Sequence, residues 1–185
     1  RSRHYAGTRY LKRGVNELGH VANDVEVEQV VDDDRSVVTS YVQLRGSVPA
    51  YWTQETSATQ PKPPIKLARR DPSHAAGRRH FQDLFARYGT PIMALNLVRQ
   101  REKQARESVI GAEFAALVDY LNSFLPHAHR IRYLPLDYSA MNKRKDPHSP
   151  GVMDVLREVA EEALRATGVF CSAPVAASRA WLTPP

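Results

Sequence analysis

Two stretches of the sequence gather basic side chains at spacings that suit a phosphorylated ligand. The first stretch, residues 1–16 (RSRHYAGTRYLKRGVN), has no acid before Glu17 and carries five cations: Arg1, Arg3, Arg9, Lys12 and Arg13. Arginine forms paired hydrogen bonds to phosphate oxygens, and a glycine such as Gly7 or Gly14 lets the backbone come close to the ligand. The stretch is a candidate phosphate site, although a solvated basic edge strand has the same pattern.

The second basic stretch is residues 99–106, RQREKQAR. It contains four cations, Arg99, Arg101, Lys103 and Arg106, and only one acid, Glu102. It follows the apolar segment 91–98, and ligands of open α/β sheets bind beyond the carboxyl ends of the strands. Near an acidic leaflet each basic residue contributes about 1 kcal/mol of attraction. We interpret the stretch as a site for phosphate or for an anionic membrane, with a solvated basic loop as the alternative.

Four other groups have residue types that can do chemistry. Arg45 ends an apolar strand beside Gly46 and Ser47, and either faces an anion or fixes the loop through backbone hydrogen bonds. The acids at 32–34 are typical of a solvated turn, because no further ligands follow at a calcium-loop spacing. His80, beside an apolar helical stripe, is expected at the boundary of the core. Cys171 follows an apolar segment and is expected to act as a small buried apolar residue.

The composition points to an anionic partner. The net charge is +6 and the pI is near 9.6, which favours nucleic acid, anionic lipid or a phosphorylated small molecule. No RNA-module signature, zinc-finger spacing or helix-turn-helix pattern is present, so we do not expect a nucleic-acid partner. No apolar run approaches the ~18 residues of a membrane span. A single cysteine fits a reducing compartment, and the start at Arg1, already within a motif, suggests an internal piece of a longer protein.

The pattern predicts an α/β fold with a mixed, partly parallel sheet flanked by helices. We expect strands at 8–15, 20–31, 36–45 (central), 91–98 (parallel and buried), 130–137 and 169–170. Helices are predicted at 71–88, starting at Asp71 and ending at Gly89, at 107–124, and at 151–167, ending at Gly168. Residues 56–64 and 138–150 are predicted loops, and Gly19 a hairpin turn. Trp52 is expected in the core.

Each predicted helix carries an apolar stripe that should face the core. The stripes are Phe81, Leu84, Phe85 and Tyr88; Ile110, Phe114, Leu117, Val118, Leu121 and Phe124; and Val152, Val155, Leu156, Val159, Ala160, Ala163 and Leu164. In the predicted strand 20–31, Glu26 and Glu28 form an acidic face that can pair with the arginines of the first strand.

Three blocks of the sequence together resemble the Sac phosphoinositide phosphatase family. They are residues 1–16 with 21–29 (VANDVEVEQ), residues 40–52 (SYVQLRGSVPAYW), and residues 88–97 (YGTPIMALNL) followed by Glu113-Phe114, in the order and spacing of the family. The resemblance reaches to about Cys171. The wording of residues 4–16 (HYAGTRYLKRGVN) and 167–172 (TGVFCS) is most similar to the polyphosphoinositide 5-phosphatase branch, which acts on phosphatidylinositol 3,5-bisphosphate at vacuolar and endosomal membranes.

The resemblance implies a cysteine phosphatase whose nucleophile this chain does not contain. The family's catalytic loop reads Cys-x-x-Asp-Cys-Leu-Asp-Arg-Thr-Asn, in which a thiolate attacks phosphorus and an arginine holds the equatorial oxygens. Cys171 is instead followed by SAPVAASR, with seven residues before Arg179. We therefore assign no catalytic residue, and interpret residues 1–185 as the central part of a Sac domain that stops before the catalytic loop, with 172–185 as an irregular tail.

The basic stretches and the resemblance together suggest roles for individual basic residues. Arg9, Arg13 and Arg45 are expected to bind substrate, and Arg3, Arg99, Arg101 and Lys103 to attract the lipid surface. The expected partners are a phosphoinositide, an anionic membrane, and a scaffold with its lipid kinase; the expected location is the face of an endosome or vacuole. No cofactor and no metal ligand is read from the sequence, although the family's activity can depend on a divalent cation. A non-catalytic module that binds anionic lipid is the alternative function.

Overall fold

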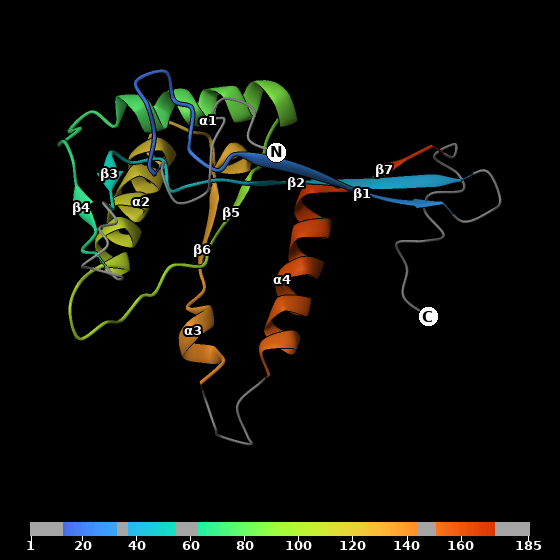
Figure 1. The fold of residues 1–185 in the computed structure, drawn as a ribbon. Coiled ribbons are helices and arrows are strands. Elements are labelled where there is room, and N and C mark those ends of the chain that lie inside the picture. Colours follow the sequence, from blue (N-terminus) through green and yellow to red (C-terminus); the bar gives the residue numbers. More distant parts are fainter. Residues whose placement is uncertain (1–12, 33–36, 55–62, 144–150, 173–185) are drawn as a thin grey trace.

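The computed structural model describes residues 13–32, 37–54, 63–143 and 151–172, and Figure 1 shows their arrangement. The strands are β1 (Val25–Asp32), β2 (Val38–Arg45), β3 (Trp52–Thr53), β4 (Lys66–Leu67), β5 (Met93–Asn96), β6 (Arg132–Pro135) and β7 (Phe170–Cys171). The helices are α1 (Ala75–Tyr88), α2 (Glu107–Asn122), α3 (Tyr138–Met141) and α4 (Val152–Thr167), with a short 3-10 turn at His127–His129.

The strands form three small sheets, so the predicted mixed α/β class is confirmed. β1, β2 and β7 pair antiparallel with β2 in the middle, as predicted for the 36–45 strand. β3 pairs antiparallel with β4 across the predicted loop. β5 and β6 pair in parallel, which confirms the parallel strand predicted at 91–98. That strand is not buried throughout, because Leu95 is 37% exposed.

The core lies between α1, α2 and β6. It is built from the predicted stripes of the first two helices and one residue before β6: Phe81, Leu84, Phe114, Leu117, Val118, Leu121 and Ile131. Gly77 of α1 lies so close to Leu117 that a Cβ there would stand 2.5 Å from its side chain, so glycine sets how closely the two helices pack. Trp52 is buried, as predicted, and its indole N–H donates to the Val48 carbonyl.

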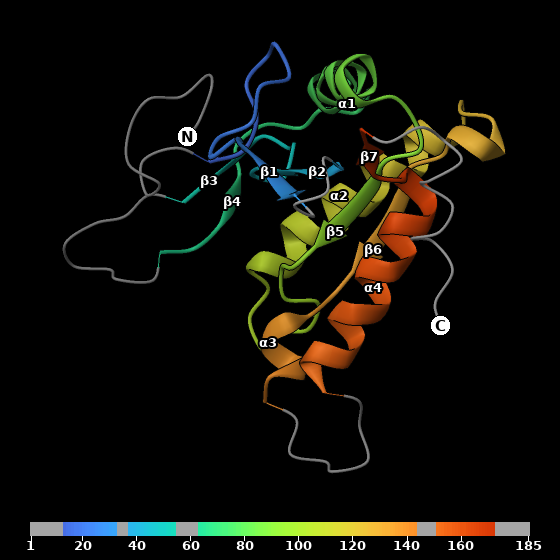
Figure 2. The same cartoon turned by 90° about the vertical axis from the view of Figure 1, so that its right-hand side faces the viewer.

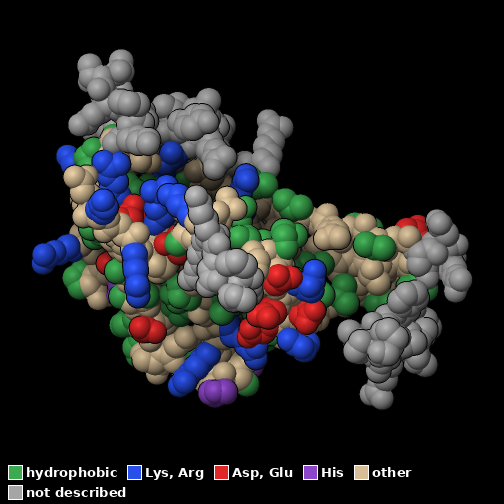
Figure 3. Space-filling model, turned by 90° about the horizontal axis from the view of Figure 1, so that it is seen from below, with side chains coloured by type: hydrophobic (Ala, Val, Ile, Leu, Met, Phe, Trp, Pro, Cys, Tyr) green, Lys and Arg blue, Asp and Glu red, His purple; other side chains and the backbone are tan. Residues whose placement is uncertain are grey.

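A second region projects from this body as an arm. Figure 1 shows the β1–β2 hairpin extending away from α1 and α2, with α4 below it, and on the face seen in Figure 3 the arm carries mostly apolar and uncharged atoms. Val27, Val30 and Val31 of β1 are all exposed. The stripe predicted for helix 151–167 is only partly covered in the described chain. Val152, Val155, Leu156, Val159 and Ala163 are half-buried, but no α4 residue is fully buried and Leu164 is 43% exposed. Periodicity selects one face of a helix, but burial requires a neighbour to cover that face.

Several predicted boundaries need correction. The first helix begins at Ala75 rather than near Asp71, because His74 adopts a left-handed conformation; the Asp71 carboxylate still accepts the Ala76 N–H. The predicted loop 138–150 contains helix α3. Phe124 lies beyond the end of α2 and is 71% exposed rather than in its buried stripe. The α1 stripe is likewise incomplete, because Tyr88 is exposed at the end of the helix.

The start of the described chain forms a turn rather than a strand. Val15 makes one isolated antiparallel bridge with Val21, and residues 8–12 of the predicted strand lie outside the described residues. The predicted turn at Gly19 is confirmed: its φ is +86°, and the Asn16 side chain accepts the backbone N–H groups of Leu18 and His20. Gly89 and Gly168 end α1 and α4 as predicted.

Candidate anion-binding site

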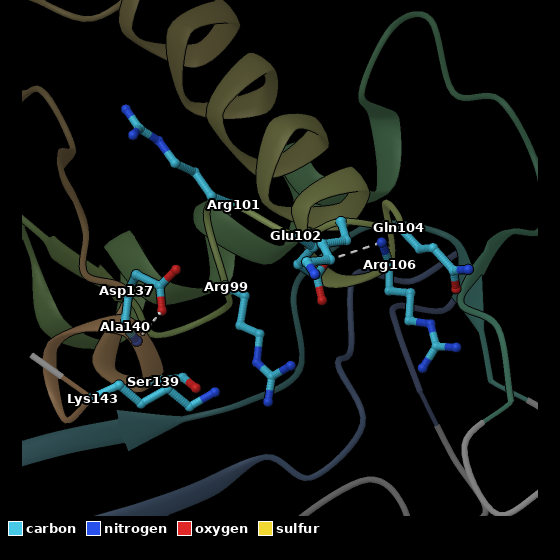
Figure 4. Close-up of a pocket in the computed structure, with 10 residues that line it drawn as sticks. Arg99, Arg101, Glu102, Gln104, Arg106, Asp137, Ser139, Ala140 and Lys143 are labelled. Carbon is cyan, nitrogen blue, oxygen red and sulfur yellow. Dashed lines mark hydrogen bonds between the residues drawn. The ribbon is translucent and has the colours of Figure 1, made fainter.

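A cavity lies where the second basic stretch meets the segment after β6. It has a volume of about 600 Å³ and is open to solvent. Its lining comes from two segments, the loop after β5 and the turn around α3: Arg99, Arg101, Glu102, Lys103, Gln104, Arg106, Asp137, Ser139, Ala140 and Lys143. Figure 4 shows these residues around the start of α2. The three predicted membrane residues of the loop therefore line one cavity.

The parallel pairing of β5 with β6 brings the two segments together. Both strands run in the same direction (Figure 2), so the loop after Asn96 and the segment after Pro135 leave the same edge of the sheet. Asn96 is buried there; its side-chain amide donates to the Tyr133 hydroxyl at 2.7 Å, and its Oδ1 accepts the Val98 N–H at 3.2 Å. These bonds fix the first residues of the basic loop.

Glu102, the one acid of the basic loop, is bound to backbone N–H groups at the start of α2. Its carboxylate accepts the N–H of Arg106 at 3.0 Å and of Ser108 at 3.1 Å. Burial, the largest single influence, raises the pKa of Glu102, but hydrogen bonds from the N–H groups of Ser108, Arg106 and Glu107 and from the Ser108 side chain outweigh it and hold the pKa below its ordinary value. The carboxylate thus occupies the helix N-terminus, where negative charge is stabilised.

Asp137 plays the matching role on the other segment. Its carboxylate accepts the Ala140 N–H at 2.8 Å, capping α3, and the Gln100 N–H at 2.9 Å, which ties α3 to the basic loop. Burial is again the largest influence and raises the pKa of Asp137; hydrogen bonds from the N–H groups of Ala140, Gln100 and Arg101, with the nearby Arg99 charge, hold it below its ordinary value. Both acids of the cavity are therefore ionised and directed at backbone groups.

The cations of the cavity lack such partners. Within the described ranges, no carboxylate lies within ion-pair distance of the side chains of Arg99, Arg101, Lys103, Arg106 or Lys143. In Figure 4 the side chains of Arg99, Arg106 and Lys143 extend to the same side of the loop, whereas that of Arg101 extends away from it. The cavity therefore presents concentrated positive charge to solvent.

The residues predicted to bind substrate are not among the residues that line this cavity. Arg13 lies over the Trp52 ring, with its guanidinium carbon 6.0 Å from the ring centre. Arg45 is exposed at the end of β2, opposite Val25 of β1. Arg3 and Arg9 lie outside the described residues, so the structure does not place them.

The whole second segment of the site was not predicted from the sequence: Asp137, Ser139, Ala140 and Lys143. The available signal was the residue type of Asp137. Aspartate is favoured at a helix N-cap, where its carboxylate accepts a backbone N–H of the first turn. That signal identifies a cap but not a neighbour, and Lys143 reaches the cavity only through the pairing of β5 with β6.

The remaining candidates take structural positions. Cys171 is half-buried in β7, where it pairs with Thr39 of β2, and the Ser172 hydroxyl accepts the Val38 N–H. The half-buried His80 of α1 is at the core boundary, as predicted; its Nδ1 is 3.0 Å from the Gly19 carbonyl oxygen, and burial lowers its pKa. Glu26 was predicted to pair with arginines of the first strand, most of which lie outside the described residues. Within the described residues, Glu26 pairs with Arg87 of α1.

The described residues offer neither a cluster of metal ligands nor a membrane-spanning helix. They contain no group of three His, Cys, Asp or Glu side chains that could hold a metal ion. Asp32 ends β1, and the other two acids of the 32–34 run are not described. None of the described helices is both long enough and apolar enough to span a bilayer.

Comparison with known families places the chain. Residues 1–143 match the model of the SacI homology domain. This match covers well over half of the chain and includes both basic stretches, so the chain belongs to the SacI homology domain family.

The chain is also similar to curated phosphatases of plants and yeast. It is 49% identical over 177 residues to the Arabidopsis thaliana phosphatidylinositol-3-phosphatase SAC1. This match covers 93% of the chain and 19% of that protein. It is 48% identical over 175 residues to the Arabidopsis phosphoinositide phosphatase SAC4, covering 92% and 21%. It is 43% identical over 186 residues to a polyphosphoinositide phosphatase of Schizosaccharomyces pombe, covering 94% and 22%. The chain thus spans about a fifth of the length of these relatives.

Proposed function

We propose that this chain is part of a phosphoinositide phosphatase that removes the 5-phosphate of phosphatidylinositol 3,5-bisphosphate. The observation that carries the proposal is the family match over residues 1–143 together with relatives that are phosphoinositide phosphatases. The cavity adds physical support, because its cations are directed at solvent rather than at carboxylates. The relatives' names include both 3-phosphatase and polyphosphoinositide phosphatase, so the position of the phosphate is the part that the experiment must decide.

The reaction would use a cysteine of the family's catalytic loop. The thiolate attacks phosphorus, the bond from phosphorus to the ring oxygen breaks, and that oxygen leaves as the alcohol after taking a proton. Water then hydrolyses the cysteinyl phosphate and releases inorganic phosphate. Cys171 does not fit this role, since it lies in a β-strand and its sequence context lacks the loop. The cations of this chain would hold the lipid head group and the membrane surface while the reaction proceeds.

The experiment measures phosphate release from vesicles that contain phosphatidylinositol 3,5-bisphosphate, phosphatidylinositol 3-phosphate or phosphatidylinositol 4-phosphate. For the intact protein that carries this chain we expect release from the bisphosphate, with phosphatidylinositol 3-phosphate as the product. Residues 1–185 alone should release none. Release by residues 1–185 that persists in the Cys171→Ser variant would contradict the assignment of the nucleophile to another part of the protein.

A second function rests on the same cavity. Unpaired cations around a hollow also suit a non-catalytic module that binds anionic lipid beside a scaffold and a lipid kinase on an endosomal or vacuolar membrane. Vesicle binding with no turnover in the intact protein would favour the module over the phosphatase.

A further inference from the structure

We propose that the cavity formed by residues 99–106 and 137–143 is a binding site for a small ring that carries two or more phosphate groups. The inference rests on the proposed function for the choice of ring, an inositol, but the site itself follows from the distribution of charge in the structure. It assigns the ligand contacts to Arg99, Arg106 and Lys143, and it assigns positioning roles to Glu102 and Asp137.

The first support is that the carboxylates of the cavity are occupied. Glu102 accepts N–H groups at the start of α2, and Asp137 accepts those of Ala140 and Gln100. Because these bonds also hold each pKa below its ordinary value, both acids stay ionised and fixed. They shape the loop and fill the helix N-terminus, so a ligand's negative charge must be met by side-chain cations.

The second support is the placement of those cations. Arg99 and Arg106 come from the basic loop, and Lys143 comes from the segment after α3. In Figure 4 all three extend to one side, and Ser139 lines the same cavity. An anion with a single phosphate can bind the cations of only one of the two segments. A ring with phosphates on different carbons presents separate anions to both segments, and each guanidinium can form paired hydrogen bonds.

The third support is size. Pockets that enclose small ligands have volumes of roughly 300 to 1,000 Å³, and the cavity volume of about 600 Å³ lies inside that range. A flat basic surface that attracts a membrane only through its charge has no need for such a hollow. The ring can be the head group of a phosphoinositide or a free inositol phosphate, since both present the same phosphates.

The test is calorimetric titration of the full chain with inositol 1,3,5-trisphosphate, which has the phosphate arrangement of the phosphatidylinositol 3,5-bisphosphate head group. We expect saturable binding that weakens about tenfold in Arg99→Gln and in Lys143→Gln, since each removes one charge-assisted contact. The matched control makes the same change at an arginine that does not line the cavity, so affinity should stay within about twofold. Arg78→Gln, on the exposed surface of α1, controls for net charge.

A vesicle arm distinguishes the two sources of the ring. The same variants are tested for flotation with phosphatidylcholine vesicles that contain phosphatidylinositol 3,5-bisphosphate, and with vesicles of equal charge that contain phosphatidylserine. Selective flotation with the same order of variants supports entry of the lipid head group, whereas binding of the soluble ring without flotation supports a free inositol phosphate as the ligand.

Two results would overturn the site: no binding of the soluble ring, or equal weakening by Arg99→Gln and Arg78→Gln, which is the behaviour of diffuse charge. Neither result bears on turnover by the intact protein. Failure of this site and failure of the proposed phosphatase activity are therefore distinguishable.

Discussion

Two basic regions of the molecule use their neighbouring acids in opposite ways. In the first, which we call the paired face, Arg69 and Arg87 form ion pairs with Glu17, Glu26 and Asp83, at closest distances of 2.9 to 3.6 Å. In the second, the cavity cations Arg99, Arg106 and Lys143 have no such pairs within the described chain, because the acids beside them accept backbone N–H groups instead. Both regions lie in a chain of net charge +6.

The difference shows why net charge alone does not locate a binding site. A guanidinium that already contacts a carboxylate must give up that contact to bind phosphate. Until then, the ion pair contributes to the stability of the fold. Arg87 joins α1 to the start of β1. Tyr88 beside it donates a hydrogen bond to Glu26, and burial together with this hydrogen bond raises the pKa of Tyr88 to about 12. We therefore expect the paired face to govern stability and the cavity cations to govern anion binding.

The largest expected effect comes from Glu102, on which the cavity depends. Glu102→Ala should lower the free energy of unfolding by about 2 kcal/mol, because the start of α2 loses its capping carboxylate. Anion affinity should also fall by about tenfold, since the loop that carries Arg99 and Arg106 is released. Urea unfolding and titration with inositol 1,3,5-trisphosphate measure the two effects. Glu161→Ala, an exposed acid on α4, is the control and should change neither.

Acidification should have a smaller effect on the same loop. The folded pKa values of Glu102 and Asp137 are below their ordinary values of 4.5 and 3.8, so their contribution to stability is complete above those values. It is lost as the pH falls through the lower, folded values. Urea unfolding from about pH 7 to pH 3 should show this loss, and Glu102→Gln should flatten that part of the profile. An unchanged profile would show that the carboxylate is not bound at the helix start.

Arg87→Ala should affect stability and leave binding alone. The side chain is 22% exposed and contacts Glu26, Asp83 and the Tyr88 ring. Its loss should cost about 1 kcal/mol of unfolding free energy, allowing for partial exposure. The affinity for the trisphosphate should stay unchanged. A fall in affinity would show that the paired face also contributes to anion binding. Arg78→Ala, also on α1, is the matched control.

The smallest expected effect is that of Arg69→Gln. Arg69 pairs with Glu17, but the two side chains are 56% and 72% exposed. Solvent and salt screen such a pair, so the unfolding midpoint should stay within the error of a urea titration at both low and high salt. A clear salt-dependent loss would show that the paired face contributes more to stability than its exposure indicates.

The sequence could predict the elements and one half of the site. The apolar stripes of α1 and α2, the parallel strand at 91–98 and the basic loop after it all follow from local pattern, and the loop does lie at the carboxyl end of a strand. Lys143 and Asp137 could not be assigned, because only the pairing of β5 with β6 brings residues about forty positions apart to one edge.

Burial was the other limit of prediction. The stripe of α4 has the same spacing as that of α2, yet α2 packs against α1 and β6 while no residue of α4 is buried among the described residues. Arg13 and Arg45 show the same limit in the prediction of binding sites. Each lies in a motif that suits anion binding, but neither lines the cavity. Local pattern indicates which face is apolar or charged, and tertiary neighbours decide what that face contacts.

The most direct test compares two double variants that remove the same charge from the two regions: Arg99→Gln with Arg106→Gln, and Arg69→Gln with Arg87→Gln. The measurement is the dissociation constant of the full chain for inositol 1,3,5-trisphosphate at one salt concentration. We predict that binding is lost in the cavity double variant and retained in the paired-face double variant. Equal losses in both would contradict the claim that the cavity cations, set free by the engagement of Glu102 and Asp137 with the backbone, form a specific site.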